Sequence, residues 1–462
     1  MQRLVRLSVN LLALGQLIVG VLVLSGLQAR AATPTGYDVN GISPVAGDNL
    51  TIAYAINNNG QVIGVSDLAD LDDFIPNSGN STKGAITSES GFLLTGSTLA
   101  VIPPLGTTSS GISAGVPTAL NDSGQVVGES PNADASSTVD IAFIYNAGVV
   151  TNLGSIIGGA TNNAVGVNNS GQIIGTFRQE PDSGPPTQSY LYNGTVQVLG
   201  KIGTTTESAS AAYAINNSGT IVGTGVASGS TAEQGIIFNA TSFQTIPLLS
   251  GATESAPLAI NAAGNVAGWS GPIAPSGSTP VTTINLTQQN ALAVLVGLSN
   301  GLIIGEPSEY EVGDAFYYNA ATQKITDLGT LGGGFSAAFG LNSDGDVVGM
   351  SLTTAGNYNA FLYNGSVMVN LNTLLPADSG WTLLTANGIN NAGDIVGFGD
   401  DNGTYEGFIL TPSGTISGGG GNGPGNNGPS PVPLPSAIWS TLATLTLIAA
   451  IGRIKTTFTA SH

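Results

Sequence analysis

Acidic side chains are the most numerous groups in this sequence that could bind a metal or transfer a proton. The 28 Asp and Glu residues are densest in DLADLDDF (residues 67–74) and NSDGD (residues 342–346). Calcium needs roughly six to eight oxygen ligands, several of them carboxylates. Segments related to NSDGD elsewhere in the chain carry Asn, Ser and Gln instead. We therefore interpret NSDGD as a hairpin turn and residues 67–74 as a solvated loop, with calcium in these acidic loops as the weaker alternative.

Catalysis by the common side-chain constellations is poorly supported. Two carboxylates can hydrolyse a glycosidic bond, but with 28 acids some chance pairs are expected, and no pair recurs in a distinctive context. The single histidine is His462, the last residue, and the chain has no cysteine. The lack of cysteine excludes a thiol nucleophile and disulfides, and the single terminal histidine argues strongly against a Ser-His-Asp triad and most zinc sites. The sequence predicts a protein that is not an enzyme and has no cofactor.

The charge distribution excludes nucleic-acid binding. Between the two ends of the chain only Lys83, Arg178, Lys201 and Lys324 are basic, against all 28 acidic residues, which leaves a formal charge of −24. A body with this charge repels phosphate backbones and stays soluble.

The elements that must position these side chains come from one repeated motif, A-h-x-h-N-x-x-G-x-h-h-G, in which h is aliphatic. Alternating apolar residues on both sides of Asn-x-x-Gly are typical of a β-hairpin, and the turn residues tolerate a positive φ. The spacing is mostly 45 to 48 residues, and an eighth copy from Gly297 lacks the Asn. The seven turns contain Asn57 and Gly60, Asn121 and Gly124, Asn168 and Gly171, Asn216 and Gly219, Asn261 and Gly264, Asn342 and Gly345, and Asn390 and Gly393.

A second hairpin follows each motif, as in IAFIYNAGVVTNLG (residues 141–154). Four strands per unit predict an all-β fold, a β-propeller of seven or eight four-stranded blades, with a β-solenoid as the alternative. The last unit has three strands, and GYDVNGIS from Gly36 could supply its fourth and close the ring. Tyrosines recur at the end of the third strand. We expect them to pack between sheets, with a sugar-stacking surface as the alternative: Tyr145, Tyr192, Tyr317, Tyr318 and Tyr363.

The repeats resemble the extracellular HAF family, named for a His-Ala-Phe triplet. Ala-Phe recurs at Ala142-Phe143, Ala315-Phe316 and Ala360-Phe361, whereas Ile141, Asp314 and Asn359 replace the His. The resemblance covers Ala53 to Leu410. It implies an extracellular location and a repeat architecture, and the family has no well-defined biochemical activity.

The N-terminus has the order of a secretory signal peptide. Arg3 and Arg6 precede an apolar run from Leu7 to Leu27. The small-x-small site that ends at Ala31 contains Ala29 and places cleavage before Ala32. An uncleaved membrane anchor is the alternative reading.

The C-terminus has a Gly/Asn/Pro-rich linker (residues 416–431) followed by an apolar stretch from Ala437 to Ile454. This stretch could cross a membrane with Arg453 and Lys455 on the cytoplasmic side and Trp439 at the opposite interface. The order of proline motif, short helix and basic end resembles the VPLP variant of PEP-CTERM sorting signals. The matching residues are Val432, Pro433, Leu434, Pro435, Trp439, Arg453 and Lys455.

That resemblance implies processing by an exosortase in a Gram-negative bacterium that makes extracellular polysaccharide. The sequence departs from the pattern after Arg453, where IKTTFTASH replaces a dense basic cluster. A plain membrane anchor is the alternative.

The complete prediction has four parts: a signal peptide (1–31), a HAF-type repeat propeller (32–415), a linker (416–431) and a sorting signal with a transmembrane helix (432–462). The protein is expected to pass through the inner membrane to the cell surface or biofilm matrix. Its expected partners are the secretion machinery, an exosortase, and extracellular polysaccharide or surface proteins. The expected function is noncatalytic binding of carbohydrate or protein, with a propeller glycoside hydrolase or polysaccharide lyase as the alternative.

Overall fold

The computed structural model describes residues 34–68, 88–106, 115–131, 140–178, 188–199, 210–226, 233–238, 243–271 and 313–413. The predicted signal peptide, linker and sorting signal, the acidic residues 70–73 and the eighth motif copy from Gly297 lie outside these residues. All structural statements below concern the described part of the chain.

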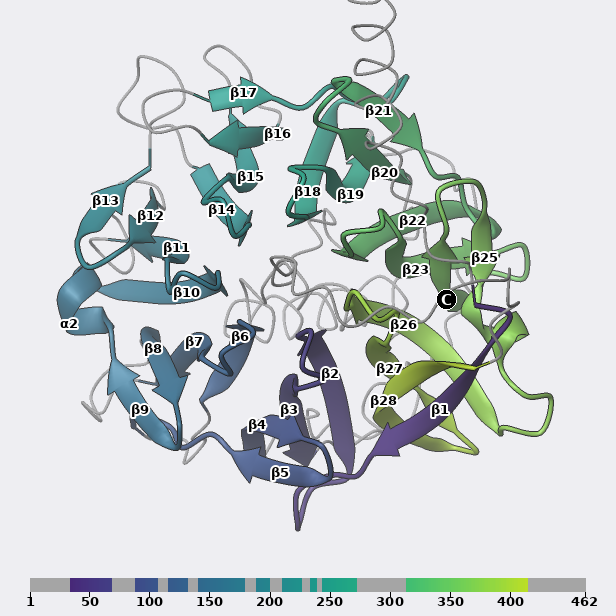
Figure 1. The fold of residues 1–462 in the computed structure, drawn as a ribbon, viewed down its shortest axis with the longest axis horizontal. Coiled ribbons are helices and arrows are strands. Elements are labelled where there is room, and N and C mark those ends of the chain that lie inside the picture. Colours follow the sequence, from purple (N-terminus) through teal and green to yellow (C-terminus); the bar gives the residue numbers. More distant parts are fainter. Residues whose placement is uncertain are drawn as a thin grey trace, which may run out of the picture.

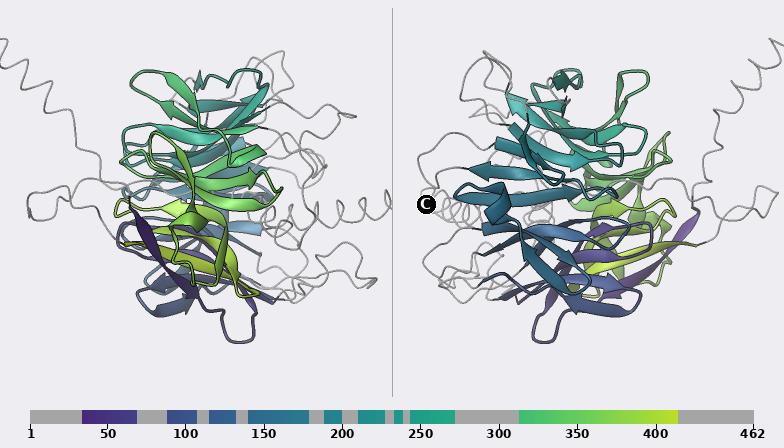
Figure 2. Two further views of the ribbon diagram at one scale, coloured as in Figure 1. Left: turned by 90° about the vertical axis from the view of Figure 1, so that its right-hand side faces the viewer. Right: turned by 60° about the vertical axis from the view of Figure 1, so that its left-hand side comes forward.

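Seven antiparallel four-stranded sheets form a ring in which each sheet is one blade (Figure 1). Side views show the blades as a single tier (Figure 2). The first three blades each follow the chain from the innermost to the outermost strand. Blade 1 has β2 (Leu50–Ile56), β3 (Val62–Leu68), β4 (Ser88–Thr95) and β5 (Thr98–Val101); blade 2 has β6 (Val116–Leu120), β7 (Val126–Pro131), β8 (Asp140–Asn146) and β9 (Val149–Asn152); blade 3 has β10 (Thr161–Val167), β11 (Ile173–Arg178), β12 (Gln188–Tyr192) and β13 (Val196–Val198).

Blades 4 to 6 repeat this order, and blade 7 combines both ends of the described chain. Blade 4 has β14 (Ser210–Ile215), β15 (Ile221–Val226), β16 (Glu233–Phe238) and β17 (Phe243–Thr245); blade 5 has β18 (Glu254–Ile260), β19 (Val266–Gly271), β20 (Asp314–Asn319) and β21 (Lys324–Asp327); blade 6 has β22 (Gly332–Leu341), β23 (Val347–Thr353), β24 (Tyr358–Tyr363) and β25 (Met368–Asn370); blade 7 has β26 (Trp381–Ile389), β27 (Ile395–Asp401), β28 (Thr404–Ser413) and β1 (Gly36–Ile42).

The ring closes as the sequence predicts, because β1 supplies the outer strand of the last blade. It pairs with β28 over its whole length, from Gly36 opposite Ser413 to Ile42 opposite Gly407. The fold is therefore a β-propeller, the described blade count is seven, and the open β-solenoid alternative is wrong.

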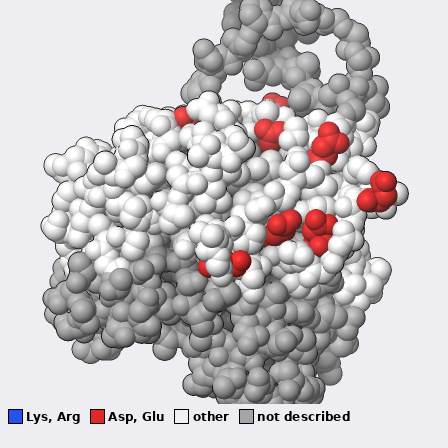
Figure 3. Space-filling model, turned by 90° about the horizontal axis from the view of Figure 1, so that it is seen from below, with Lys and Arg blue, Asp and Glu red and all other residues white. Residues whose placement is uncertain are grey.

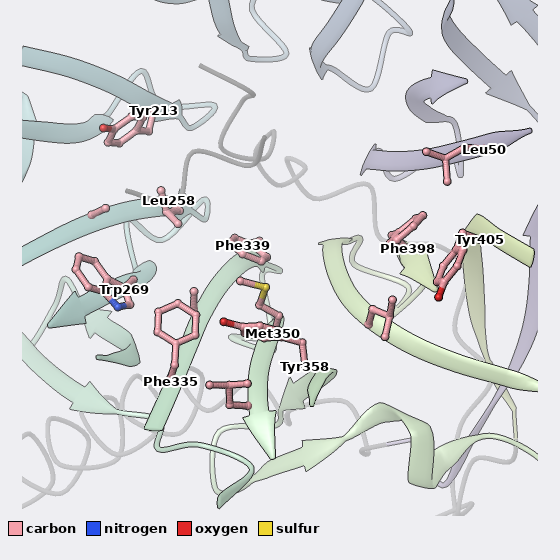
Figure 4. Packing of buried hydrophobic residues seen from close by; sticks show 14 residues of the cluster. Leu50, Tyr213, Leu258, Trp269, Phe335, Phe339, Met350, Tyr358, Phe398 and Tyr405 are labelled. Atoms are coloured by element: carbon pink, nitrogen blue, oxygen red, sulfur yellow. The ribbon is translucent and has the colours of Figure 1, made fainter. Parts of the chain in front are cut away.

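The core lies between the blades. One cluster of buried apolar side chains fills each of the seven interfaces, for example Ala55, Ile63, Leu120 and Phe143 between blades 1 and 2. A further cluster projects from several blades toward the centre and includes Tyr213, Leu258 and Phe339 (Figure 4). Such side chains fill the narrow middle of a ring of twisted sheets.

Every innermost strand carries a β-bulge three residues before the motif Asn. The register slips, for example, between Ala53 and Ala55, so that Tyr54 has no partner in β3. A bulge bends and twists its strand, and here it turns one side chain of each blade toward its neighbours. The bulged residues are all buried: Tyr54, Thr118, Val165, Tyr213, Leu258, Phe339 and Asn387.

Helix is nearly absent from the described residues. It is limited to the four-residue α2 (Gly154–Ile157) and a 3-10 turn at Leu371–Leu374. Within the described residues, no helix has the length and apolar character needed to cross a membrane. The predicted transmembrane helix lies beyond Ser413, outside these residues.

Candidate functional site

Each motif Asn organises its own hairpin turn. The side-chain oxygen of Asn168 accepts hydrogen bonds from the backbone N–H groups of Ser170 and Gln172, both at 3.0 Å. This is the local side chain to backbone bonding for which Asn is favoured in turns. Gly171 completes the turn with a φ of 74°, a value that glycine adopts without strain. Asn and Gly occupy these two positions in all seven turns.

The side-chain nitrogen of each motif Asn reaches the next blade. It donates to the backbone carbonyl of the following motif Asn, and the seventh donates back to the first, so the bonds form a closed circle. All seven Asn side chains are buried, and the donor to acceptor distances lie between 2.9 and 3.4 Å. The circle runs Asn57, Asn121, Asn168, Asn216, Asn261, Asn342, Asn390 and back to Asn57.

The structure thus brings the seven motif Asn together in a buried hydrogen-bonded circle, whereas each motif Gly serves its own turn. A ligand has little access to these amides, since their hydrogen-bonding atoms already have protein partners. Sequence reasoning gave each Asn a role in its own turn and missed the bond between blades. The sequence did contain a signal for this bond between blades. Asn recurs at this position in seven copies, although several residue types suit such a turn.

A second, outer row of polar groups lies on the same face. The N–H of Asn58 donates to Asp122, whose N–H donates to the side chain of Asn169, and Asn169 contacts Asn217 in the same way. The row is interrupted at Ala262, whose side chain has no polar atom. This face therefore presents partly exposed amide and carboxylate groups around the buried circle.

The Ala-Phe pair of the third strands also helps to form the contact between neighbouring blades. The N–H of Ala315 donates to the hydroxyl of Ser336 in the next blade at 2.8 Å, and Gly407 contacts Thr51 in the same way. The following aromatic residue, such as Phe316, is fully buried. A small residue is needed before it because the neighbouring innermost strand passes close by.

Acidic groups gather at the strand ends opposite the Asn turns, between blades 4 and 5. Glu233 begins β16 and Glu254 begins β18. The backbone N–H of Glu233 donates to Oε1 of Glu254 at 3.4 Å. Asp314 begins β20 of the same blade 5. The charge nearest to Asp314 in its effect is that of Asp327. We call Glu233 and Glu254 the blade 4–5 acidic site.

Burial and like charge make these carboxyl groups harder to ionise. Burial raises the pKa of Glu233, the hydroxyl of Thr224 lowers it by a hydrogen bond, and the charge of Glu254 raises it. Burial also raises the pKa of Glu254. The pKa of Asp314 is raised to about 6, first by burial and then by the charge of Asp327. The site therefore consists of carboxyl groups in an unfavourable environment for negative charge.

Polar groups lead from this site toward the centre of the ring. Thr224 is buried, and its hydroxyl lies 3.1 Å from that of Tyr213. Burial raises the pKa of Tyr213, and the charge of Glu233 raises it further. Tyr213 therefore stays a neutral hydroxyl near neutral pH and cannot act as a phenolate.

Trp269 has a buried N–H group near the same strand ends. Its side chain is 5% exposed, and its indole nitrogen has no hydrogen-bond partner within the part of the chain that the structure describes. The nitrogen lies against the backbone of Gly313, where a Cβ would collide with it. Gly313 precedes Asp314, and Gly271 beside it pairs with Glu254. Gly313 also pairs with Phe335 of blade 6, so the indole nitrogen lies beside the backbone that joins blades 5 and 6.

Within the described residues, no group of three acidic, His or Cys side chains could hold a metal. Residues 342–346 form a hairpin turn like the others, in which Asn342 donates to Oδ2 of Asp346 at 3.1 Å. Of the third-strand tyrosines, Tyr145 and Tyr318 are buried, whereas Tyr192, Tyr317 and Tyr363 are half-buried. The described part of the acidic segment 67–74 is the end of β3 alone.

Several predicted site residues lie outside the described part of the chain and have no structural counterpart here. They are the cleavage residues Ala29, Ala31 and Ala32 and the sorting-signal residues Val432, Pro433, Leu434, Pro435, Trp439, Arg453 and Lys455.

Comparisons with known proteins find similarity only to solved structures of low sequence identity. No family model matches the chain, and no curated protein matches it. Among solved structures, the β-propeller domain of the trilobed protease from Pyrococcus furiosus is 10% identical, with a TM-score of 0.44 over 78% of this chain and 95% of that one. A catalytically inactive virginiamycin B lyase from Staphylococcus aureus is 9% identical, with a TM-score of 0.43 over 81% and 99% of the two chains.

The six-bladed fungal lectin of Aleuria aurantia is 11% identical, with a TM-score of 0.37 over 75% of this chain and 100% of that one. At this level of identity the likenesses concern the fold alone. They include a protease domain, a lyase and a lectin, and they do not select among these activities.

Proposed function

We propose that this protein is an exported, noncatalytic propeller of the cell surface or exopolysaccharide matrix that binds carbohydrate. The observation that carries the proposal is the blade 4–5 acidic site on a closed ring. There, the carboxyl groups of Glu233 and Glu254 lie together at the start of β16 and β18. Polar groups that are held on rigid strands can bind the hydroxyl groups of a carbohydrate.

Export is supported by the sequence at both ends of the chain. The proposed route is Sec-type secretion with cleavage before Ala32, a membrane intermediate held by residues 437–454, and exosortase processing near the proline motif. The absence of cysteine is compatible with an oxidising compartment, because no thiol can mispair there. Where the two described ends meet, at Gly36 and Ser413, a single place on blade 7 would carry both signals.

Binding is best tested with residues 32–415, purified without either signal and screened on a glycan array and against isolated matrix polysaccharide. The expected result is retention of specific glycans without release of products. A double variant, Glu233→Gln and Glu254→Gln, should lose this binding. The control is Asp344→Asn, which removes an exposed acid from the opposite face. Failure of the intact ring to bind any glycan or matrix preparation contradicts the proposal.

The neighbouring Glu233 and Glu254 favour one second candidate, a glycoside hydrolase or polysaccharide lyase. A carboxyl with a raised pKa can serve as a general acid beside a second carboxyl. Incubation of matrix polysaccharide with the ring should then yield new reducing ends or unsaturated products. Turnover that falls in Glu233→Gln and Glu254→Gln, with an unaffected Asp344→Asn control, would establish the enzyme in place of the binding protein.

Processing is tested by mass spectrometry of the native protein. The expected mature N-terminus is Ala32, and the expected C-terminus lies before or within residues 432–439. Recovery of a cytoplasmic product that still contains Met1–Ala31 and Pro433–His462 would contradict both the export and the sorting proposal.

A further inference from the structure

The outer rim of blades 1 to 3 lacks charged side chains. No Asp, Glu, Lys or Arg occurs in residues 91–106, 141–160 and 188–199, which form the outer halves of these blades except for the first residues of β4 and β8. The outermost strands of blades 5 and 7 differ, since they present the exposed Asp327 and Asp38. In Figure 3 the left edge of the molecule, the side of blades 2 and 3 in Figure 1, shows no charged side chain among the described residues. The negative charge is therefore distributed unevenly around the ring.

The same rim carries most of the large apolar side chains that are exposed. The described residues contain five of them, and four lie on blades 1 to 3: Val101, Val149, Ile156 and Val198. Val149 is the most exposed of the five at 64%, and Ile156 is 49% exposed. Both belong to the outer edge of blade 2, where Val149 begins β9 and Ile156 lies in the following α2 (Figure 1). Single exposed apolar residues are ordinary, but their concentration on one uncharged side is typical of an interaction surface.

Strand β9 also has an edge that is available for pairing. It pairs with β8 from Val149 opposite Asn146 to Asn152 opposite Phe143, and it is the last strand of its sheet among the described residues. In an antiparallel pair the backbone N–H and C=O groups of alternate residues point away from the partner, so an edge strand offers them to another strand. Proteins often block such edges with charged residues or proline. The sequence of β9, VVTN, contains neither.

Charge decides which partner this edge fits. The formal charge of −24 on the body makes two copies of the chain repel each other, and contact at the rim of blade 5 or blade 7 would add repulsion between neighbouring acids. Contact at blade 2 keeps those acids apart. A two-fold contact uses the same patch on both copies, so the patch must be complementary to itself. An uncharged strand edge with an apolar residue at each end meets this condition, whereas an acidic patch does not.

We infer that the rim of blade 2 is the contact surface of a symmetric dimer of this chain, in which β9 pairs antiparallel with β9 of a second copy. Val149 lies at one end of this edge, and Ile156 lies beyond the other end. Antiparallel pairing about a two-fold axis therefore places Val149 of each copy beside Ile156 of the other. The two blades then form one continuous sheet. The dimer forms whether or not the ring binds carbohydrate.

The test is sedimentation of residues 32–415 over a range of protein concentrations. We expect a monomer–dimer equilibrium with a Kd of about 10 µM, which is weak because the paired edge is short. The dimer should become tighter as salt is raised from about 0.05 M to about 0.5 M, since salt screens the repulsion between the two acidic bodies.

A charge exchange across the contact tests the antiparallel arrangement. Val149→Asp should weaken the dimer at least about tenfold, because it places a carboxylate against an apolar side chain. Addition of Ile156→Lys to this variant should restore the dimer, since each new carboxylate then faces the new ammonium group of the other copy. Thermal unfolding of each variant verifies that the ring is intact.

Val367 supplies the matched controls, because it is a similarly exposed valine, at 54%, on the distant blade 6. Val367→Asp adds the same charge as Val149→Asp and should leave the dimer unchanged. Val367→Lys combined with Val149→Asp restores the net charge away from the contact and should fail to restore the dimer.

Every other outcome contradicts the dimer in a distinguishable way. A protein that stays monomeric up to about 1 mM refutes it. Equal weakening by Val149→Asp and Val367→Asp shows a general effect of charge, and failure of Ile156→Lys to restore the dimer refutes the antiparallel arrangement. A dimer that weakens as salt is raised is held by charge and not by this edge. A monomer that binds uncharged lipid vesicles through Val149 assigns the rim to a membrane instead.

Discussion

The amide of each motif Asn acts in two directions. Its oxygen closes the turn in its own blade, and its nitrogen bonds to the backbone of the next blade, so one side chain satisfies several buried polar groups. A buried hydrogen-bonded network of this kind stabilises strongly when all of its members are present and is costly when one is missing. At the residue scale, the turn residue is thus also the residue that joins the blades.

Replacement of Asn168 by Ala should lower the free energy of unfolding by about 3 kcal/mol. It removes the acceptor for two turn N–H groups and the donor to the carbonyl of Asn216. The matched control is the adjacent, exposed Asn169→Ala, for which we expect a loss below about 1 kcal/mol. Urea unfolding measures both values. Equal losses for the two variants would contradict the structural role of the circle.

Asp314 should make the stability of the ring depend on pH. In the unfolded chain an Asp titrates near about 4, whereas burial and Asp327 raise the pKa of Asp314 to about 6 in the folded ring. The folded state therefore binds more protons between these values, and stability falls as the pH rises through this window.

The variant Asp314→Asn should remove part of this fall, so its melting temperature changes less between about pH 4 and about pH 6. The exposed control Asp344→Asn should keep the slope of the parent ring. A parent protein whose stability rises steadily across the window would show that the environment of Asp314 is wrongly assigned.

At the scale of the blade, the bulge in the first strand and the second motif glycine form one unit. The bulge brings the carbonyl of Asn163 against Gly175, and the ring of Tyr190 covers the same place, its hydroxyl donating to that carbonyl at 2.8 Å. A Cβ at Gly175 would collide with both groups. The equivalent glycine lies against the same backbone carbonyl in all seven blades.

The variant Gly175→Ala should therefore lower the free energy of unfolding by about 3 kcal/mol, since the backbone must move to make room. Gly194 of the same blade is the control, because a Cβ there meets no atom within 4 Å and its φ is 96°. Its replacement by Ala should cost about 1 kcal/mol of backbone strain alone. If chemical denaturation shows the two variants to be equally stable, the close approach is not limiting.

At the scale of the whole molecule, the ring depends on the joining of its two ends. Strand β1 covers β28 and contributes Tyr37 and Ile42 to buried clusters beside blade 7. It also accepts a hydrogen bond at Ile42 from the hydroxyl of Thr51 in blade 1. Seen from its edge, the ring shows only acidic charged side chains in this view, gathered on one half (Figure 3). Closure of the ring therefore rests on strand pairing and on the burial of Tyr37 and Ile42.

Deletion of residues 34–42 should lower the melting temperature by at least about 10 °C, because it removes a whole strand and two buried side chains. Hydrogen exchange should accelerate first in β28. A protein that begins at Gly36 is the matched control and should melt like the parent ring. Unchanged melting of the deletion variant would mean that β1 does not hold the ring closed.

Much of the fold could be predicted because the same sequence pattern recurs in every repeat. Seven copies of a hairpin motif with alternating apolar residues define the strands and turns and leave the blade number at seven or eight, and the three-stranded last unit points to Gly36 as its partner. The bulges could not be predicted, since residues as different as Thr118 and Asn387 occupy the same position. A bulge is set by the backbone and the neighbouring blade more than by its own side chain.

The blade 4–5 acidic site was beyond sequence reasoning for a different reason. Glu233 and Glu254 lie in different blades, and neither belongs to the repeated motif. Their proximity results from the packing of neighbouring blades. Trp269 likewise looks like an ordinary strand residue in the motif copy from Ala259 until its N–H is found without a described partner.

The circle of asparagines also suggests how such a ring can be lengthened by gene duplication. Each motif Asn supplies a donor to the blade after it and an acceptor to the blade before it, so every copy carries both halves of the contact. A duplicated unit would therefore carry both hydrogen-bonding halves of this one contact. Loss of the Asn from one copy, by contrast, affects its own turn and its contact with the next blade.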